Sequence, residues 1–364
     1  MMRADGDAAF AGLSGRGAWR SASASKDLTD LPPVAVGALG GTIAMSAPRQ
    51  GATGAVPSLD AEGLLDMVPR LRSVADFRVR NISATGSASL SFDDLLNALD
   101  FAKEQAESGV AGIVLAHGTD TLEESAYFLD LLWDRPEPIV FTGAMNTESS
   151  ITQDGPQNIV DAVQTVLANS MRGMGVLVCL AGQVHLAHTV VKTNSTDLAT
   201  FQSPDWGPVA RIVEGNVHAA WRPAHRRMVL ATPERPYKPY IPVVETGLGN
   251  EGRTLAALAG GDTTPDAIVL AASGAGHLSS SCADVAAGIV ADGTPVVFAT
   301  HTGSGSTFRR TYGYAGGEMA LIRKGLIPAG FLTARQSRIL LGVLVANHAD
   351  IAAVKRAFRH EGQW

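Results

Sequence analysis

Short runs of uninterrupted apolar residues recur along the chain and constrain its fold more than any other feature. Each run is too short for a core helix and too continuously apolar for a strand with one solvated face. The runs therefore fit parallel strands that are covered on both sides. The four clearest are residues 34–39, 112–116, 138–142 and 175–180.

Segments with helical spacing separate these runs. Residues 92–102 place apolar side chains on one helix face, and Thr121-Leu-Glu-Glu124 has the pattern of a capping box that opens a second helix. Strands and helices therefore alternate. This alternation predicts a doubly wound α/β fold with a mostly parallel sheet.

The strand–helix alternation breaks between residues 191 and 222, where Glu214-Gly215-Asn216 is typical of a hairpin turn. A run rich in proline and arginine follows, with the composition of a linker, and the α/β pattern then resumes up to a terminal helix from about Thr333. The sequence predicts a disordered leader or an overextended start at 1–31, a larger N-terminal catalytic domain at 32–222, a linker at 223–243 and a smaller C-terminal α/β domain at 244–364.

Charge and composition exclude several classes of partner. The net charge of −6 argues against nucleic acid, whose phosphates require a clustered basic surface. No apolar run approaches the roughly 20 residues that span a bilayer, and residues 1–30 lack the apolar core of a secretory signal. Cys179 and Cys282 belong to no metal-binding motif. We therefore expect buried free thiols, a cytoplasmic location, no membrane partner, no metal and no cofactor.

Small and polar residues follow three of the apolar runs, at the sheet edge where open parallel sheets bind ligands. The clusters are Gly40-Gly41-Thr42, His117-Gly118-Thr119-Asp120-Thr121 and Gly143-Ala144-Met145. A threonine after two glycines exposes its hydroxyl beside free backbone N–H groups, which suits a nucleophile near donors for an oxyanion. The first cluster lacks the GxGxxG spacing of a dinucleotide site, so a nucleotide-binding protein is only weakly supported.

Each candidate residue also has an ordinary structural interpretation. Thr42 fits a turn or a helix cap, and on this motif alone that interpretation is favoured. Asp120 fits a helix N-terminus, where the helix dipole stabilises a carboxylate, and His117 fits a residue that orders the loop. Lys192 precedes a loop rich in Thr and Asn, so it is either a solvated lysine or a partly buried one paired with a carboxylate.

These pieces occur together and in one order, and as a set they resemble the bacterial L-asparaginase/glutaminase family. Gly40-Gly-Thr-Ile-Ala44 is similar to the first signature of that family, and residues 117–128 resemble the second almost residue for residue. Residues 143–145 with 154–158, and residues 192–197 running into Gly207-Pro208, resemble two further family segments. The resemblance covers residues 34–364.

The resemblance implies a reaction and a catalytic set. Thr42 would attack the side-chain amide of L-asparagine, release ammonia and form a β-aspartyl ester. Thr119, Asp120 and Lys192 would form a second hydroxyl–lysine–carboxylate set, in which Lys192 moves a proton or polarises the water that hydrolyses the ester.

The resemblance also implies the substrate contacts and the assembly. Ser87 would bind the α-carboxylate, Asp120 the α-ammonium group, and the backbone near Ala144 the side-chain amide, with Thr119 and Ala88 completing the set. The family further implies a homotetramer or a dimer with sites near subunit interfaces, and L-glutamine as a second substrate.

The chain departs from the family pattern at three places. The family carries a tyrosine in its mobile lid, whereas residues 49–55 contain none, and Thr53 is the nearest hydroxyl. Ala88 stands where the family has a glutamine, so the selectivity between asparagine and glutamine is open, and Ser89 is a candidate to replace part of the lost hydrogen bonding. The family's glutamate from a neighbouring subunit has no clear match, although Glu318 is present.

Two alternatives to an L-asparaginase follow from these features. One is the asparaginase-like subunit of a tRNA-dependent amidotransferase, which is disfavoured because the leader is too short for the β domain of that subunit. The other is an amino-acid-binding pseudoenzyme, for which the missing tyrosine and Ala88 argue. The retained Thr42, Thr119, Asp120 and Lys192 argue against it.

Overall fold

The computed structural model describes residues 31–41, 45–46, 56–57, 60–147, 150–224 and 228–363. We refer to residues 31–224 as the N-terminal lobe and to residues 228–363 as the C-terminal lobe. Leu31–Trp364 forms a single unit by its contacts. The boundaries expected at residues 222 and 244 therefore stay a prediction, and the leader lies outside the described residues.

An eight-stranded sheet forms the centre of the N-terminal lobe, in the order β12-β11-β8-β7-β6-β5-β1-β4. The five strands from β4 to β7 in this order are parallel, and β8, β11 and β12 extend the sheet by antiparallel pairing. The strands are β1 (Pro33–Ala38), β4 (Asp76–Asn81), β5 (Ile113–Ala116), β6 (Ile139–Thr142), β7 (Val176–Leu180), β8 (Gln183–Leu186), β11 (Ala210–Val213) and β12 (Asn216–Ala219). The four apolar runs are thus strands, as predicted.

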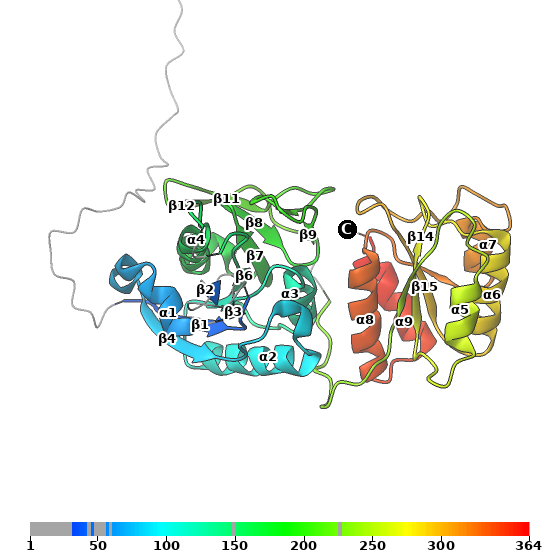
Figure 1. Ribbon diagram of the computed structural model, residues 1–364, viewed down its shortest axis with the longest axis horizontal. Coiled ribbons are helices and arrows are strands. Elements are labelled where there is room, and N and C mark those ends of the chain that lie inside the picture. The colour runs from blue at the N-terminus through cyan, green and yellow to red at the C-terminus, as the bar shows by residue number, and fades with distance from the viewer. Residues whose placement is uncertain are drawn as a thin grey trace, which may run out of the picture. The chain divides into compact units, whose positions relative to one another are not determined.

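Helices cover both faces of the parallel part of this sheet (Figure 1). They are α1 (Ala61–Asp66), α2 (Phe92–Glu107), α3 (Leu122–Asp130) and α4 (Gly155–Leu167). Along β5, Ile113 and Leu115 pack with α2 and α3, whereas Val114 packs with α1 and α4 on the opposite face. Because successive side chains of a strand point to opposite faces, a strand buried on both sides must be continuously apolar.

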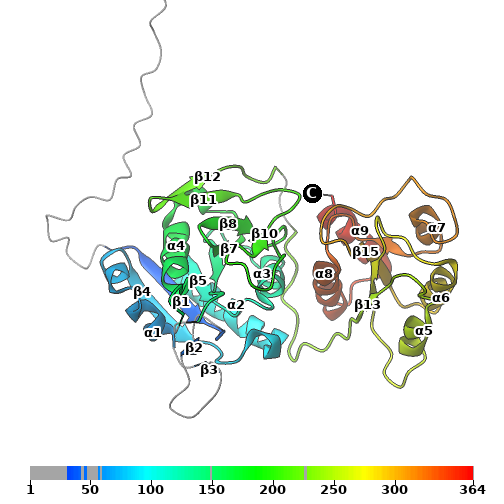
Figure 2. The same ribbon diagram turned by 45° about the horizontal axis from the view of Figure 1, so that its top comes forward.

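A parallel sheet of four strands, in the order β13-β14-β15-β16, forms the centre of the C-terminal lobe. One face packs against α5, α6 and α7 and the other against α8 and α9 (Figure 2). The elements are β13 (Val243–Glu245), α5 (Arg253–Ala259), β14 (Ile268–Ala272), α6 (Ser280–Ala291), β15 (Val296–Thr300), α7 (Glu318–Arg323), β16 (Ile327–Pro328), α8 (Ala334–Ala346) and α9 (Ile351–Glu361). The predicted fold class, a larger and a smaller α/β unit, is confirmed.

Short elements complete the described chain. Two pairs of short strands are β2 (Met45–Ser46) with β3 (Val56–Pro57), and β9 (Val191–Lys192) with β10 (Phe201–Gln202). Three short 3₁₀ segments are η3 (Pro69–Ser73), η4 (Ser87–Ser89) and η5 (Asn169–Met171). Among the residues with assigned structure, no helix has both the length and the apolar character needed to cross a bilayer.

Three local predictions have clear outcomes. The hairpin is confirmed: Glu214 and Gly215 join β11 to β12 with φ of 50° and 74°, the two positive values of a type I′ turn. The terminal helix does begin after Thr333, but the chain then turns through His348 at φ 55° into a separate helix, α9. The capping box at Thr121 was wrong: the Thr121 hydroxyl accepts no hydrogen bond from the first turn of α3 and instead lies against the Ser87 carbonyl, to which it donates.

Candidate active site

Three strand ends meet at one edge of the N-terminal sheet with unusually close backbones. Gly41, at φ 93°, follows β1, and a methyl group on it would lie 2.2 Å from the Gly118 Cα that follows β5. A methyl group on Gly118 would in turn lie 2.6 Å from the hydroxyl oxygen of Ser87. Only glycine allows this approach, since it carries no Cβ and accepts a positive φ. A methyl group on Gly143, in the third cluster, would lie 2.6 Å from the His117 carbonyl oxygen. The described parts of the three clusters predicted from the sequence are therefore neighbours in space.

Lys192 joins two of the predicted residues. Its ammonium nitrogen lies 3.0 Å from the Thr119 hydroxyl oxygen and 3.2 Å from a carboxylate oxygen of Asp120. The Lys192 side chain is 14% exposed, whereas the Asp120 side chain is 71% exposed. Lys192 is thus the partly buried and paired lysine of the two sequence alternatives. Asp120 keeps most of its carboxylate free to meet a cationic group of a ligand.

Glu123 is a residue that sequence reasoning missed. Its buried carboxylate, on the first turn of α3, accepts a hydrogen bond from the backbone N–H of Lys192. The other carboxylate oxygen accepts from the guanidinium group of Arg335, on α8, at 2.6 Å. The Glu123 side chain therefore links α3 and the strand that carries Lys192, both in the N-terminal lobe, to α8 in the C-terminal lobe. The sequence does contain the acidic pair Glu123-Glu124, but the capping-box interpretation assigned this segment to the start of a helix and not to the site.

The expected substrate-binding residues lie around the same edge. Ser87 is buried at the start of η4, and the adjacent Ala88 is exposed. Ala144 is buried after β6. Asp154 holds the loop that follows Ala144 by accepting from the backbone N–H groups of Met145 at 3.0 Å and Asn146 at 2.9 Å. Thr42, and the lid positions 49–55 with Thr53, lie outside the described residues.

His117 orders the loop between β5 and α3. The side chain is fully buried, its Nδ1–H donates to the carbonyl of Gly118 at 2.6 Å, and its ring contacts Phe141 edge-on. Burial lowers the pKa of His117 to about 4, although the bond to Gly118 opposes that shift. The imidazole is therefore neutral near pH 7 and carries no charge into the site.

A large and a small cavity lie beside Lys192. The large one has a volume of about 670 Å³ and is lined by polar side chains that include Glu123, Lys192, Glu245, His301 and Arg335. Its size suits a small polar molecule, but of the predicted site residues only Lys192 lines it, so the cavity adjoins the Thr119–Asp120 set rather than enclosing it.

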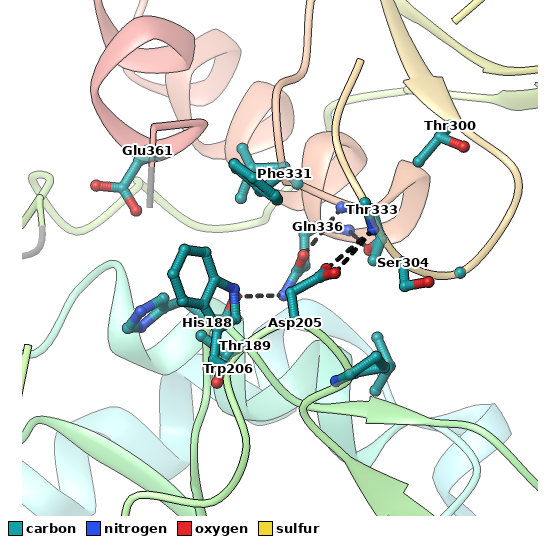
Figure 3. A pocket seen from close by; sticks show the side chains of 15 residues that line it. His188, Thr189, Asp205, Trp206, Thr300, Ser304, Phe331, Thr333, Gln336 and Glu361 are labelled. Atoms are coloured by element: carbon teal, nitrogen blue, oxygen red, sulfur yellow. Dashed lines mark hydrogen bonds between the residues drawn. The ribbon is translucent and has the colours of Figure 1, made fainter. Parts of the chain in front are cut away.

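The small cavity, of about 30 Å³, lies where Trp206 and Phe331 meet (Figure 3). Around it, Gly305 donates to Asp205 at 3.0 Å and Gln336 donates to the carbonyl of His188 at 2.9 Å. A volume of this size holds one or two waters, so this cavity is a small gap between packed side chains and is too small for a substrate.

Glu318 has a place in the C-terminal lobe. It is fully buried at the first position of α7, where it accepts from the backbone N–H groups of Thr311 at 2.6 Å and Tyr312 at 2.8 Å. His277 approaches the other carboxylate oxygen at 3.3 Å. Burial alone would raise the pKa of Glu318, but the backbone donors outweigh it and lower the pKa. Glu318 therefore anchors its own loop within this lobe.

Cys179 and Cys282 are buried free thiols, each within its own lobe.

The site combines groups for two tasks. A hydroxyl held beside a lysine ammonium can exchange a proton with it, and an exposed carboxylate with buried polar neighbours can bind a zwitterionic amino acid. An open α/β sheet with such a set at the carboxyl ends of its strands is the architecture of an enzyme that acts on a small polar substrate.

Comparison with known proteins identifies the family. The model of the asparaginase N-terminal domain matches residues 33–225, and that of the glutaminase/asparaginase C-terminal domain matches residues 242–358. L-asparaginase 2 of Escherichia coli (strain K12) is 30% identical over 338 residues, which cover 90% of this chain and 93% of that protein. The probable L-asparaginase of Deinococcus radiodurans is 33% identical over 339 residues, covering 90% and 97%.

The solved structures include a probable cytoplasmic L-asparaginase from Campylobacter jejuni. It is 28% identical, with a TM-score of 0.80, and the match covers 90% of this chain and 99% of that one. The protein belongs to the asparaginase family.

Proposed function

We propose that the protein hydrolyses L-asparagine to L-aspartate and ammonia, and that Thr119, Asp120 and Lys192 take part in the reaction. The observation that carries the proposal is the position of the Lys192 ammonium, within hydrogen-bond distance of both the Thr119 hydroxyl and the Asp120 carboxylate. The family membership and the names of the relatives support the same substrate.

Thr42 is the proposed nucleophile. Its hydroxyl oxygen attacks the side-chain carbonyl carbon of asparagine, the C–N bond breaks, and the nitrogen leaves as ammonia after taking up a proton. Water then adds to the β-aspartyl ester, and the C–O bond to Thr42 breaks to release aspartate. The Lys192–Thr119 pair moves the protons of these steps: the Lys192 ammonium gives a proton through the Thr119 hydroxyl, and the neutral amine that remains takes up the next one.

The substrate's charged groups match the residues at the sheet edge. Asp120 binds the α-ammonium group, because its carboxylate is exposed, whereas the side chain of its partner Lys192 is mostly buried. Ser87 binds the α-carboxylate, and the backbone beside Ala144 binds the side-chain amide. Ala88, in the position of the family's glutamine, removes polar contacts that would discriminate between substrates, so L-glutamine is the second substrate to test.

Glu123 is proposed as a positioning residue. It holds the Lys192 backbone through one carboxylate oxygen and Arg335 through the other. Because the strand pair β9–β10 is only two residues long on each side, this anchor restrains where the Lys192 side chain starts. The role is to aim Lys192 at Thr119 rather than to touch the substrate.

Assembly and location complete the proposal. We propose a homotetramer or dimer with sites near subunit interfaces, and native mass spectrometry tests this assembly against a monomer. We propose the cytoplasm as the location, in line with the solved relative described as cytoplasmic. A relative from Haemophilus influenzae is described as periplasmic, so fractionation of the native host is the deciding measurement.

Ammonia release from L-asparagine and L-glutamine, measured side by side across concentrations, tests the function. We expect release from asparagine, and its loss in Thr42→Ala. Thr263→Ala, at an exposed position of the C-terminal lobe, is the matched control and should keep the activity. Binding of asparagine without any ammonia release would favour an amino-acid-binding protein instead.

A further inference from the structure

A separate cavity opens in the C-terminal lobe and shares no lining residue with the cavities beside Lys192. Its volume is about 160 Å³. The wall is apolar and comes from α7, β16 and α9, with Leu326, Ile327 and Phe358 as its buried part. Three cations stand around this wall, namely Arg309, Lys355 and Arg359.

Arg359 has a like-charged neighbour on two sides, Lys355 and Arg309. Lys355 and Arg359 are four residues apart on α9, so their side chains lie on one helix face, where like charges are destabilising. Arg309 reaches the same cavity from the loop after β15. Burial, and the nearby charge of Arg359, lower the pKa of Arg309.

No carboxylate of the residues that the structure describes forms an ion pair or hydrogen bond with these three side chains. Arg359 stands in the last turn of α9, where the helix dipole favours a cation. That explanation accounts for one of the three charges. The charges of Lys355 and Arg309 are not explained by the helix dipole, and both side chains line the same apolar wall.

We propose that this cavity binds a small organic carboxylate whose apolar body is about the size of a benzene ring. The apolar wall receives the body, since a cavity of about 150 Å³ is known to hold benzene. The carboxylate pairs with the Arg309 guanidinium, whose planar donors match two oxygens at once. Lys355 and Arg359 supply further positive charge at the rim. The anion relieves the repulsion among the cations that the free protein carries.

Benzoate is the probe that combines both features, and two controls separate them. Benzamide keeps the ring without the charge, and acetate keeps the charge without the ring. In calorimetric titrations of the full-length protein at low salt, we expect benzoate to bind with a dissociation constant on the order of 1 mM. Benzamide and acetate should bind at least about tenfold more weakly, and added salt should weaken benzoate binding.

Variants locate the binding. Arg309→Gln and Lys355→Gln should each weaken benzoate binding by about tenfold, because each removes one charged partner. Arg356→Gln is the matched control, since Arg356 is an exposed cation on α9 that does not line the cavity, and it should leave binding unchanged. Lys355 is exposed, so its variant is expected to fold even if Arg309→Gln does not.

The candidate active site could also bind a carboxylate, so the titration is repeated in Lys192→Met and with saturating L-aspartate. Unchanged benzoate affinity in both assigns the binding to the C-terminal lobe, whatever the outcome of the asparagine assay. Three results would overturn the proposal. They are no binding of benzoate at about 10 mM, equal binding of benzamide, and full binding in both Arg309→Gln and Lys355→Gln.

Discussion

Gly118→Ala tests whether the close backbone approach at the sheet edge builds the site. The new methyl group would lie 2.6 Å from the Ser87 hydroxyl oxygen, 2.8 Å from the Ser87 Cβ and 3.1 Å from the Gly41 Cα. The first two distances are well inside van der Waals contact, and the third involves a backbone atom that cannot rotate away. Ser87 or the chain at Gly41 must therefore move.

The size of the effect follows from this crowding. Forcing one extra carbon into a packed region costs about 1–3 kcal/mol, so we expect urea unfolding to show a loss of that order. The movement displaces Ser87 or the strand end that precedes Thr42. Misplacing reacting groups by about 1 Å can cost about 100-fold in rate, so we expect a loss of asparagine turnover larger than the loss of stability implies.

Gly288→Ala is the matched control. Gly288 lies in the exposed part of α6, and a methyl group there would meet no atom within 4 Å. The same substitution should therefore stabilise the protein by about 0.5–1 kcal/mol and leave turnover unchanged. Wild-type stability and turnover in Gly118→Ala would refute the claim that the contact of Gly41, Gly118 and Ser87 shapes the site.

Two further changes test other parts of the account. Glu123→Gln removes the charge that pairs with Arg335. We expect kcat to fall by about tenfold with a smaller change in KM, because Lys192 is misplaced while the substrate contacts remain. An unchanged kcat would show that Glu123 does not position Lys192. Burial lowers the pKa of His117 and His185 to about 4 in the folded state, so below the ordinary value of 6.5 the unfolded chain binds protons that the folded chain refuses. Stability should be highest above pH 6.5 and fall toward pH 4, by up to about 3 kcal/mol for each histidine, and urea unfolding that is flat over this range would contradict the buried neutral state.

Much of the fold was accessible from the sequence because burial on both faces leaves a direct signature. The strand at 113–116 is continuously apolar since its two faces pack against different helices. The turn at Glu214-Gly215 was equally readable, because a two-residue hairpin needs two positive φ values. Local rules decide such elements.

Features that depend on distant partners were not accessible. Thr121 matched a capping box, yet its hydroxyl is oriented toward the Ser87 carbonyl, 34 residues away in sequence, and makes no cap on α3. Glu123 lies inside the same segment but is not the acidic position of the capping box, and nothing local indicated that Arg335 would reach it across more than two hundred residues. The pairing of Lys192 with Thr119 was expected only through the family resemblance, because the lysine's surroundings fitted a solvated loop equally well.

A double-mutant cycle tests whether Lys192 and Thr119 act together in catalysis. It compares asparagine turnover in Thr119→Val, Lys192→Met and the double variant. Each single change should lower kcat by at least about 100-fold, because each removes one member of a proton-transferring pair. If the 3.0 Å contact between the Lys192 ammonium and the Thr119 hydroxyl acts as one unit, the double variant loses no more than the worse single variant. Losses that multiply, or near-wild-type turnover in either single variant, would contradict the account.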